Sequence, residues 1–343
     1  MNKKSFLALP EVKFSIIIPN YNGSVFIPDC LNSVVTAIKN CPSANIELIF
    51  VDNGSKDNSV QLAKKITSNF PILNTKYLIL NTNHGFASAV NKGINHSKYP
   101  WVVVLNNDLT MKQNWFELIN TTIQKNKNPK ITTFFGTVLN KDGTKFESQG
   151  LDFKIQGKCL NLSNGKKFNK NVFLKTNKLL TNRLIWGAPA SLIVYKKDII
   201  QKIGLFDEDF FAYEEDVDLS FRLNRLGYKT LYVPSAISYH LGGGTSNKMG
   251  NFRSRMDTKN WIFLIIKNYS AREFWLNIGN IFIERLRNFS GLIKNTIIKY
   301  HFISLFYLPY DIFRTYGEVI LKLPKMFQKR HQIQKLLKST KSN

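Results

Sequence analysis

Four short apolar segments alternate with helix-like segments over the first third of the chain. Their length and β-branched composition are typical of buried strands. They lie at 14–19, 46–51, 76–80 and 101–105. Apolar residues at helical spacing follow the first three, over 27–38, 59–69 and 86–94. This alternation predicts an α/β fold, a Rossmann-like and mostly parallel sheet with right-handed crossovers and flanking helices.

Each of the four predicted strands ends in polar, small or acidic residues. The endings read PNYNG, DNGS, NTNHG and NND. In parallel α/β sheets, ligands bind beyond the carboxyl ends of the strands, so these endings predict one binding site. The sequence has no Gly-x-Gly-x-x-Gly after the first strand and no Gly-x-x-x-x-Gly-Lys-Ser/Thr motif. Both absences weigh against a dinucleotide fold and a P-loop ATPase.

Asp108, at the end of the fourth segment, has two interpretations. Mg²⁺ sites commonly use one or two carboxylates, with substrate oxygens and water as the other ligands. Asp108 could therefore hold a divalent ion that bridges two phosphates. Alternatively, its carboxylate caps a helix before Trp115 and Phe116, and its position alone favours this simpler role.

A second feature is a concentration of acidic residues in a chain whose formal net charge is +25. Seven of the 23 acidic residues lie within twelve positions: Asp207, Glu208, Asp209, Glu214, Glu215, Asp216 and Asp218. The apolar spacing beyond Asp216 predicts a helix, whose first turn favours carboxylates. Alternatively, Phe210, Phe211 and Tyr213 form an apolar wall that raises the pKa of the Glu215–Asp216 pair and creates a general base. Both interpretations stay open from this segment alone.

The composition limits the cellular compartments and the binding partners that we expect for this protein. With 43% hydrophobic residues, the 343-residue chain can bury a sizeable core. Three scattered cysteines predict a reducing compartment, and the sequence has neither a signal-peptide pattern nor an apolar run of about 18 residues. We therefore expect a cytoplasmic protein. The basic charge suits nucleic acid or an anionic membrane, but no nucleic-acid-binding motif accompanies it, so we expect no nucleic-acid partner.

The C-terminal part of the chain is basic and aromatic. Residues 262–343 include 14 Lys and Arg against 4 Asp and Glu, and apolar residues recur near helical spacing between the cations. This pattern is typical of helices that lie in a membrane interface, and it predicts peripheral attachment to the inner face of the cell membrane. The alternative is a helical annex packed on the rest of the chain. We place the domain boundary after residue 260, giving domains 1–260 and 261–343.

The middle of the chain is less regular. Short β-like segments over 131–180 predict strands and loops on the acceptor side of the site. The small residues at 187–190 allow either the close approach of a ligand or a tight bend. His240 precedes the glycine run 242–244, which makes it a candidate metal or pyrophosphate ligand, although a lone histidine is usually structural or exposed.

Six motifs follow one another in a fixed order over residues 14–269. They are SIIIPNYNG at 15–23, VDNGSKDNS at 51–59, NTNHGFASAVNKGI at 81–94, LNNDL at 105–109, the segment 187–228 and YHLGGGTS at 239–246. Each is weak alone, but the ordered set is specific. The set resembles glycosyltransferase family 2, the inverting nucleotide-sugar transferases of GT-A fold, and within it a group that includes bacterial rhamnosyltransferases.

The resemblance implies a nucleotide-sugar site at the strand ends. It would place Pro19, Tyr21, Asn22, Asp52, Asn53 and Gly54 around the nucleotide base, with Asp52 bonded to the pyrimidine ring. The rest of the donor would contact Asn83, Gly85, Phe86, Asn91, Asn106 and Asn107. The expected donors are dTDP- or UDP-linked sugars.

The resemblance also implies a metal site and a catalytic base. Asp108 would be the metal-binding end of the family's Asp-x-Asp motif, and His240 would be a second contact to the metal or the diphosphate. The first Asp of that motif is replaced by Asn106, which brings no charge to an Mg²⁺ or Mn²⁺ ion. Asp216 would be the catalytic base, with Glu215 beside it.

These implications predict a metal-dependent, inverting hexosyltransferase. It would move a sugar from dTDP-rhamnose or a UDP-hexose to a saccharide acceptor, lipid-linked if the membrane attachment holds, in cell-surface polysaccharide synthesis. The competing hypothesis is a non-catalytic binding or scaffold protein at the membrane surface with a transferase fold. The sequence leaves the oligomeric state open, a homo-oligomer included.

Overall fold

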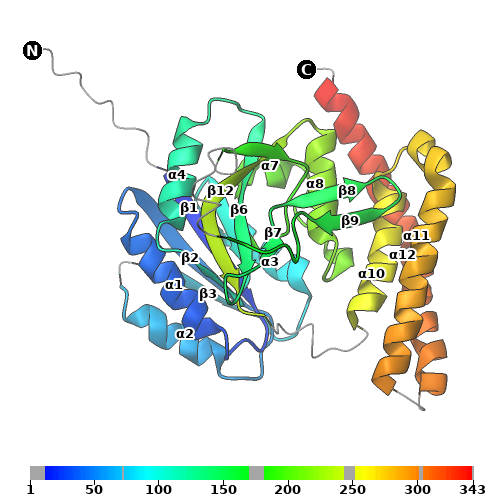
Figure 1. Cartoon of the computed structure of the whole chain (residues 1–343), viewed down its shortest axis with the longest axis horizontal. Coiled ribbons are helices and arrows are strands. Elements are labelled where there is room, and N and C mark those ends of the chain that lie inside the picture. Colours follow the sequence, from blue (N-terminus) through cyan, green and yellow to red (C-terminus); the bar gives the residue numbers. More distant parts are fainter. Residues whose placement is uncertain (1–11, 72, 170–180, 243–251, 301–303, 342–343) are drawn as a thin grey trace, which may run out of the picture.

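The structure is a computed structural model that describes residues 12–71, 73–169, 181–242, 252–300 and 304–341. Figure 1 shows a twisted central sheet between helices, with a group of long C-terminal helices at one side of the molecule. The sheet has ten strands. Eight follow the order β10-β12-β6-β11-β4-β1-β2-β3, while β5 pairs with β12 and β7 with β6. The predicted fold class, an α/β sheet with flanking helices and a C-terminal helical extension, is confirmed.

The N-terminal half of the sheet is parallel. β1 pairs with β2 and β4, and β2 pairs with β3. These strands are β1 (Val12–Asn20), β2 (Ala44–Asp52), β3 (Asn74–Ile79) and β4 (Trp101–Leu105). The helices between them are α1 (Ile27–Lys39), α2 (Ser59–Ser68) and α3 (Phe86–His96). All seven elements match the predicted segments, because buried strands and amphipathic helices leave distinct apolar patterns.

The second half of the sheet is mixed. β11 (Leu192–Lys196) is antiparallel to β4 and to β6 (Ile131–Asn140), whereas β12 (Lys229–His240) is parallel to β6. The short strands are β5 (Leu109–Met111), β7 (Phe146–Ser148) and β10 (Arg183–Ile185). A separate hairpin joins β8 (Leu151–Lys154) to β9 (Lys158–Asn161). Parallel pairing therefore holds for β1 to β4 and for β6 with β12.

The main core lies on both faces of β1. Ile16, Ile17 and Ile18 are all fully buried, as expected for a strand covered on both sides. α3 covers one face, where a Cβ at Gly93 would lie 2.4 Å from Cγ2 of Ile17. On the opposite face, the ring of Phe14 lies 5.7 Å from that of Phe116 in α4 (Trp115–Lys125).

Three C-terminal helices form a packed annex: α10 (Phe252–Asn268), α11 (Ala271–Tyr300) and α12 (Ser304–Lys341). α10 contacts η1 (Glu208–Phe210) and α8 (Glu215–Arg225), and α11 and α12 pack on α10. Phe221 of α8 shares an apolar cluster with Trp261 and Phe263 of α10. The boundary predicted after residue 260 falls inside α10, a helix that packs on the sheet domain.

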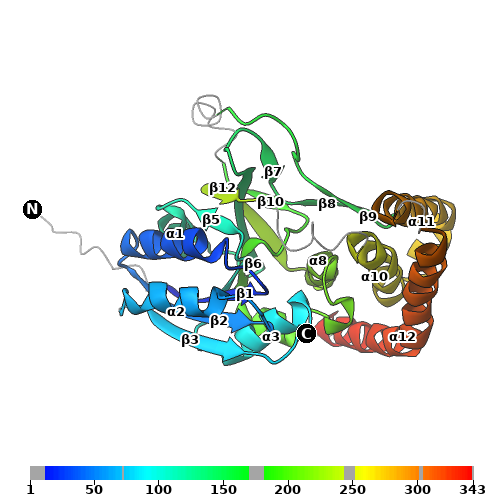
Figure 2. The same cartoon turned by 90° about the horizontal axis from the view of Figure 1, so that it is seen from below.

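α12 bends along its length. Figure 2 shows its last part running back toward the sheet domain, and the helix contains Pro309 and Pro324. Proline removes a helical hydrogen bond and kinks the chain. Within the described residues, no helix combines the length and the apolar character needed to cross a membrane.

Candidate functional site

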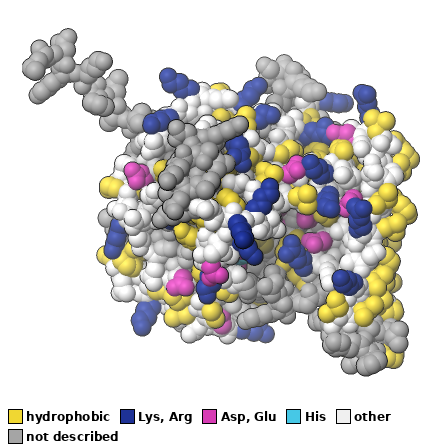
Figure 3. Space-filling model, in the orientation of Figure 1, with side chains coloured by type: hydrophobic (Ala, Val, Ile, Leu, Met, Phe, Trp, Pro, Cys, Tyr) yellow, Lys and Arg dark blue, Asp and Glu magenta, His cyan; other side chains and the backbone are white. Residues whose placement is uncertain are grey.

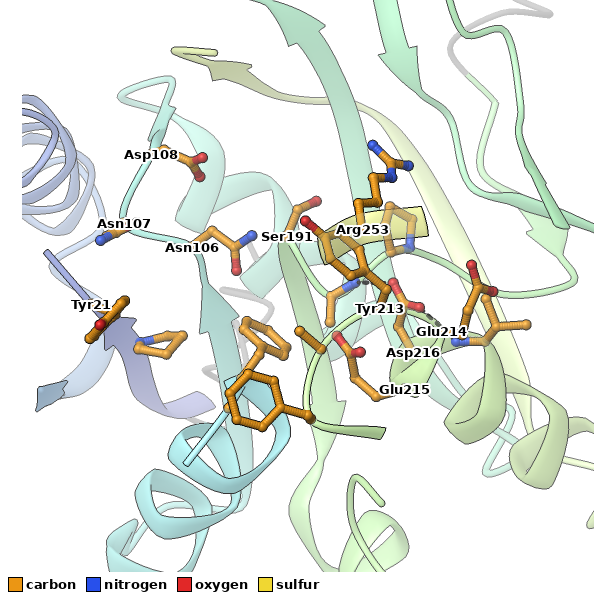
Figure 4. Close-up of a pocket in the computed structure, with 18 of the residues that line it drawn as sticks. Tyr21, Asn106, Asn107, Asp108, Ser191, Tyr213, Glu214, Glu215, Asp216 and Arg253 are labelled. Atoms are coloured by element: carbon orange, nitrogen blue, oxygen red, sulfur yellow. Dashed lines mark hydrogen bonds between the residues drawn. The ribbon is translucent and has the colours of Figure 1, made fainter. Parts of the chain in front are cut away.

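A cleft of about 420 Å³ separates the carboxyl ends of β1, β2 and β4 from the N-terminus of α8. Many predicted site residues line it: Pro19, Tyr21, Asn53, Asn83, Gly85, Phe86, Asn106, Asn107, Asp108, Glu215 and Asp216. Figure 4 shows the strand-end residues Asn106 and Asp108 on one side and the carboxylates of Glu215 and Asp216 on the other. The two features singled out in the sequence thus meet across one cavity.

Side-chain amides fasten the strand-end loops to one another. Asn53 donates from Nδ2 to Oδ1 of Asn83 and to the carbonyl of Gly85, both at 3.0 Å, and accepts at Oδ1 from the backbone N–H of His84 at 3.0 Å. Asp52 is buried beneath the cleft, where Oδ1 accepts from Nδ2 of Asn20 at 2.9 Å. Asn53 therefore fixes the cleft wall, and Asp52 lies outside the lining.

Three other predicted donor residues also lie outside the lining. Asn22, at φ +51°, accepts at Oδ1 from the backbone N–H of Lys56 at 2.8 Å. Gly54 has φ +79°, and a Cβ there would lie 2.7 Å from the backbone of Thr82. Asn91 donates to the carbonyl of Phe206 at 2.8 Å and accepts from its N–H at 3.1 Å. Their contacts shape loops, and Asn91 ties α3 to the acidic segment.

His240 lies at the end of β12, beside the carboxylate of Asp108. Its Nε2 is 3.1 Å from Oδ2 of Asp108, and its Nδ1 is 2.5 Å from Oε2 of Glu147 in β7. Burial opposes the charged imidazolium, but hydrogen bonds to the two carboxylates outweigh it and raise the pKa of His240 to about 10. His240 is therefore a cation here. The following glycine run, from 243 onward, lies outside the described residues.

The strand end of β4 has the chemistry of a site for a hard divalent cation. Oδ1 of Asn106 and Oδ1 of Asp108 are buried and have no hydrogen-bond partner among the described residues. Carboxylate and amide oxygens are the ligands that Mg²⁺ prefers, usually with water and substrate oxygens. Across the ranges that the structure describes, no group of three or more His, Cys, Asp or Glu is arranged to hold a metal. The two oxygens fit such an ion, whereas His240 would first have to lose its proton and its bond to Asp108.

The opposite wall presents two carboxylates on the first turn of α8. Asp216 accepts at Oδ1 from the N–H of Val217 at 2.7 Å and at Oδ2 from the N–H of Ala190 at 3.1 Å. Burial raises the pKa of Asp216, and these backbone bonds offset it only in part. Burial, followed by the charge of Asp216, raises the pKa of Glu215 well above its usual value. The position of these carboxylates in the first turn of a helix and their raised pKa, posed as alternatives, thus occur together.

A family model matches the part of the chain that forms the strand-end side of this cleft. The model of glycosyl transferase family 2 matches residues 15–204, more than half of the chain. The chain belongs to this family. The match ends before α8, so the assignments of Glu215, Asp216 and His240 rest on the cleft and on the motif resemblance.

Similar proteins match this chain over greater lengths. A poly-beta-1,6-N-acetyl-D-glucosamine synthase of Staphylococcus epidermidis is 23% identical over 313 residues, which are 85% of this chain and 69% of that one. The synthase of Staphylococcus aureus strain COL is 25% identical over 250 residues, and there the match spans only 53% of the relative. This chain therefore corresponds to part of those synthases.

Several solved structures share the fold of this chain. S. aureus TarS, residues 1–349 in complex with UDP-GlcNAc, has a TM-score of 0.52 and 13% identity, covering 94% of this chain and 92% of that one. The mannosyltransferase PcManGT of Pyrobaculum calidifontis, in complex with GDP-Man and Mn²⁺, has a TM-score of 0.54 and 12% identity, with coverage of 96% and 86%. At these identities the likeness concerns the fold.

The remaining wall of this family 2 cleft includes residues that the sequence did not single out. Leu151, Cys159 and Asn161 come from the β8–β9 hairpin, and Phe252 and Arg253 come from the start of α10. Single-sequence patterns cannot find them, because a weakly patterned hairpin and a distant helix meet only in the fold.

Two predictions about the cleft walls have mixed outcomes. The predicted apolar wall is present in part: Phe211 and Tyr213 line the cleft, whereas Phe210 is buried beneath it. At Gly187, a Cβ would lie 2.5 Å from Oγ of Ser220, so the small residues at 187–190 allow the close approach of α8. Ala190 then contributes its N–H to Asp216.

Proposed function

We propose that this chain is an inverting glycosyltransferase that moves a sugar from a nucleoside diphosphate to a hydroxyl of a saccharide acceptor. The observation that supports this best is the cleft with polar strand ends on one side and, on the other, the buried Glu215 and the partly buried Asp216, both with a raised pKa (Figure 4). Inversion requires the leaving diphosphate and the attacking hydroxyl to lie on opposite faces of the sugar. A cleft with two chemically different walls suits that requirement.

Asp216 is the proposed general base. The acceptor hydroxyl gives its proton to Asp216 while its oxygen bonds to the anomeric carbon, and the bond from that carbon to the diphosphate oxygen breaks with its electron pair. A raised pKa makes the carboxylate a stronger base toward a hydroxyl. The N–H groups of Val217 and Ala190 orient it, and Glu215 lies beside it as the second carboxylate.

The strand-end wall is the proposed donor side. Asn53, Asn83 and Phe86 would contact the nucleotide sugar, while Asn106 and Asp108 would hold Mg²⁺ or Mn²⁺ through their buried oxygens. When bound, such an ion neutralises the negative charge that develops on the leaving diphosphate. The complex of PcManGT, which shares the fold, with GDP-Man and Mn²⁺ supports a nucleotide sugar and a divalent ion as the ligands.

The motif resemblance and the similar proteins limit the choice of donor and acceptor. The donor candidates are dTDP-rhamnose, from the motif resemblance, and a UDP-hexose, which the complex of TarS with UDP-GlcNAc supports. The similarity to a synthase of poly-beta-1,6-N-acetyl-D-glucosamine supports a role in cell-surface polysaccharide synthesis. We therefore propose a saccharide acceptor, carried by a lipid at the membrane.

Attachment to an anionic membrane forms part of this proposal. α11 and α12 expose large apolar side chains at the spacing of one helix face, including Trp275, Phe282, Phe306, Phe313 and Leu321. Figure 3 shows hydrophobic side chains along the edge of the molecule that α11 forms. The same part of the chain, 262–343, has ten more basic than acidic residues. An apolar face with surrounding cations suits a membrane surface.

A thermal-shift panel tests the proposal. dTDP, UDP, GDP and their sugars are each added with Mn²⁺, Mg²⁺ or a chelator, to wild type and to Asp108→Ala. A ligand at a hundred times its Kd stabilises a protein by about 2.7 kcal/mol, which gives a clear shift. We expect a metal-dependent shift with one base, and a weaker shift in Asp108→Ala because the ion loses a charged ligand. A folded protein that no nucleotide stabilises would instead favour the non-catalytic scaffold.

A further inference from the structure

The segment from Asp207 to Asp218 carries the catalytic carboxylates and has an unfavourable backbone. Phe211, Tyr213 and Glu214 have φ values of +67°, +68° and +65°. Residues with side chains rarely adopt this left-handed region, and they stay in it only where the surroundings impose it. Some other part of the protein must therefore hold the segment in this shape.

One side chain of α10 holds the strained turn. Asn260 is fully buried, and its Nδ2 donates to three carbonyls of the turn, those of Phe210 at 3.0 Å, Ala212 at 2.9 Å and Tyr213 at 2.7 Å. The directions of these carbonyls follow from the left-handed backbone. Asn260 thus stabilises the conformation that brings Glu215 and Asp216 to the cleft.

A second side chain of α10 joins the two ends of the segment. Nζ of Lys267 is 2.6 Å from Oδ2 of Asp207 and 2.8 Å from Oδ2 of Asp218. All three side chains are buried, and Arg222 also pairs with Asp218, at 2.7 Å. Removing one partner from such a buried ionic group leaves charges uncompensated. Lys267 therefore sets the distance between the start of the segment and α8.

α12 holds the same segment from outside. Nζ of Lys329 pairs with Asp207 and lies 2.5 Å from Oδ2 of Asp209, while Nζ of Lys325 lies 2.8 Å from that same oxygen. Hydrogen bonds from Lys325 and Lys329 outweigh the effect of burial and lower the pKa of Asp209 to about 2. Asp207, Asp209 and Asp218 are thus neutralised by the annex, whereas Glu215 and Asp216 face the cleft.

We propose that Asn260, Lys267 and Lys329 are positioning residues, through which the C-terminal helices orient the catalytic carboxylates. This rests on the proposed function for its chemistry. The turn also touches the donor wall, because the carbonyl of Phe211 accepts from the N–H of Ala87 at 3.4 Å. A loosened turn misplaces Asp216 against the acceptor, while the loops that would bind the nucleotide are held separately by Asn53.

Lys329 offers the sharpest test because its side chain is partly exposed, so its variants should fold. Lys329→Gln removes the cation, Lys329→Arg keeps it, and Lys335→Gln makes the same change at an exposed lysine of the same helix. The first readout is hydrogen exchange of the amides in 207–218, which needs no substrate. We expect exchange to be about tenfold faster in Lys329→Gln than in wild type, with Lys329→Arg and Lys335→Gln close to wild type.

The second readout separates positioning from a merely structural role. UDP binding with Mn²⁺ and hydrolysis of UDP-GlcNAc, or of the donor that the thermal-shift panel selects, are measured on the same proteins. We expect kcat to fall at least about tenfold in Lys329→Gln, with nucleotide binding and KM for the donor unchanged, and Lys329→Arg to restore kcat. Asn260→Asp, which loses the donated bonds, should show the same split.

Two results would overturn the inference. Wild-type exchange over 207–218 in both Lys329→Gln and Asn260→Asp would mean that the annex does not hold the segment. Faster exchange with unchanged kcat would mean that it holds the segment without positioning the base. An inactive wild-type protein would count against the proposed function, but the exchange comparison would still decide whether the annex holds the segment.

Discussion

Among the acidic residues at 207–218, some have a raised pKa and others a lowered pKa. The difference arises because Lys and Arg side chains lie close to only some of them. Asp218 is fully buried, but Arg222 and Lys267 outweigh its burial and lower its pKa. Asp216, two residues earlier, is partly buried at the cleft wall, where it accepts from backbone N–H groups that offset the effect of burial only in part, so its pKa is raised. A carboxylate with a raised pKa at a cleft wall is suited to accept a proton.

Asp216→Asn should abolish transfer without unfolding the protein. A general base typically contributes about 10³-fold to the rate, so we expect a loss of that order in kcat with nucleotide binding unchanged. The base acts as a carboxylate and its pKa is raised, so the wild-type rate should fall, as the pH decreases, at a pH above the usual Asp pKa of about 3.9. Steady-state kinetics against pH would measure both effects.

Asp198→Asn is the matched control for that experiment. Asp198 lies on α7 (Lys197–Lys202), its side chain is exposed, and it pairs only weakly with Lys196, at 3.5 Å. The control should keep wild-type kinetics. Near-normal transfer by Asp216→Asn would remove Asp216 from its role and leave Glu215 as the candidate base.

Among the helices and strands, the features that could be predicted are those that depend on residues close together in the sequence. The strands β1 to β4 and their polar ends follow from local patterns, because a buried strand needs a continuous apolar run. Asp108 and Asp216 were found the same way. Glu147, Asn260 and Lys329 were not, because their partners lie 47 to 122 residues away. The sequence around a lysine on a basic helix does not indicate that its side chain forms an ion pair with a buried aspartate.

The contact between α3 and the acidic segment can be tested at Gly85, which precedes α3. Gly85 has φ +87°, and a Cβ there would lie 2.4 Å from the carbonyl oxygen of Phe211. Gly85→Ala should cost about 1–3 kcal/mol because its backbone, at φ +87° and ψ 166°, lies in a region essentially confined to glycine, and a further roughly 1–3 kcal/mol for displacing the turn. Urea denaturation would measure the loss.

Gly165→Ala is a comparison variant with a positive φ but no close contact. Gly165 has φ +76°, and among the described residues no atom lies within 4 Å of a Cβ placed there. This variant should lose only the backbone contribution. Equal losses in Gly85→Ala and Gly165→Ala would mean that the turn yields without cost, contrary to a firmly held segment.

For the whole molecule, the distribution of surface character bears on where the protein works. Of the 19 large hydrophobic residues that are exposed in the described part of the chain, 15 lie between Trp275 and Phe327. Scattered apolar residues are normal on a protein surface, but a contiguous group marks an interaction site. The annex thus has two faces: one binds the catalytic segment, and the other is apolar with cations around it.

Vesicle flotation tests the outer face. The double variant Phe306→Ser/Phe313→Ser removes two side chains that are 80% and 79% exposed, and Val25→Ser, at 77% exposure before α1, is the control. Burying a phenylalanine is worth about 2 kcal/mol, so the double variant, which loses about 4 kcal/mol, should bind phosphatidylglycerol vesicles roughly 1,000-fold more weakly than wild type.

The salt dependence of the same assay separates the two contributions to binding. Salt screens charges over about 8 Å at physiological ionic strength, so binding through cations should weaken as salt is added and should be lost on neutral phosphatidylcholine. Flotation of the double variant equal to that of wild type would mean that the apolar face does not enter the membrane. The acceptor would then reach the cleft from solution, and its lipid would no longer be part of the proposal.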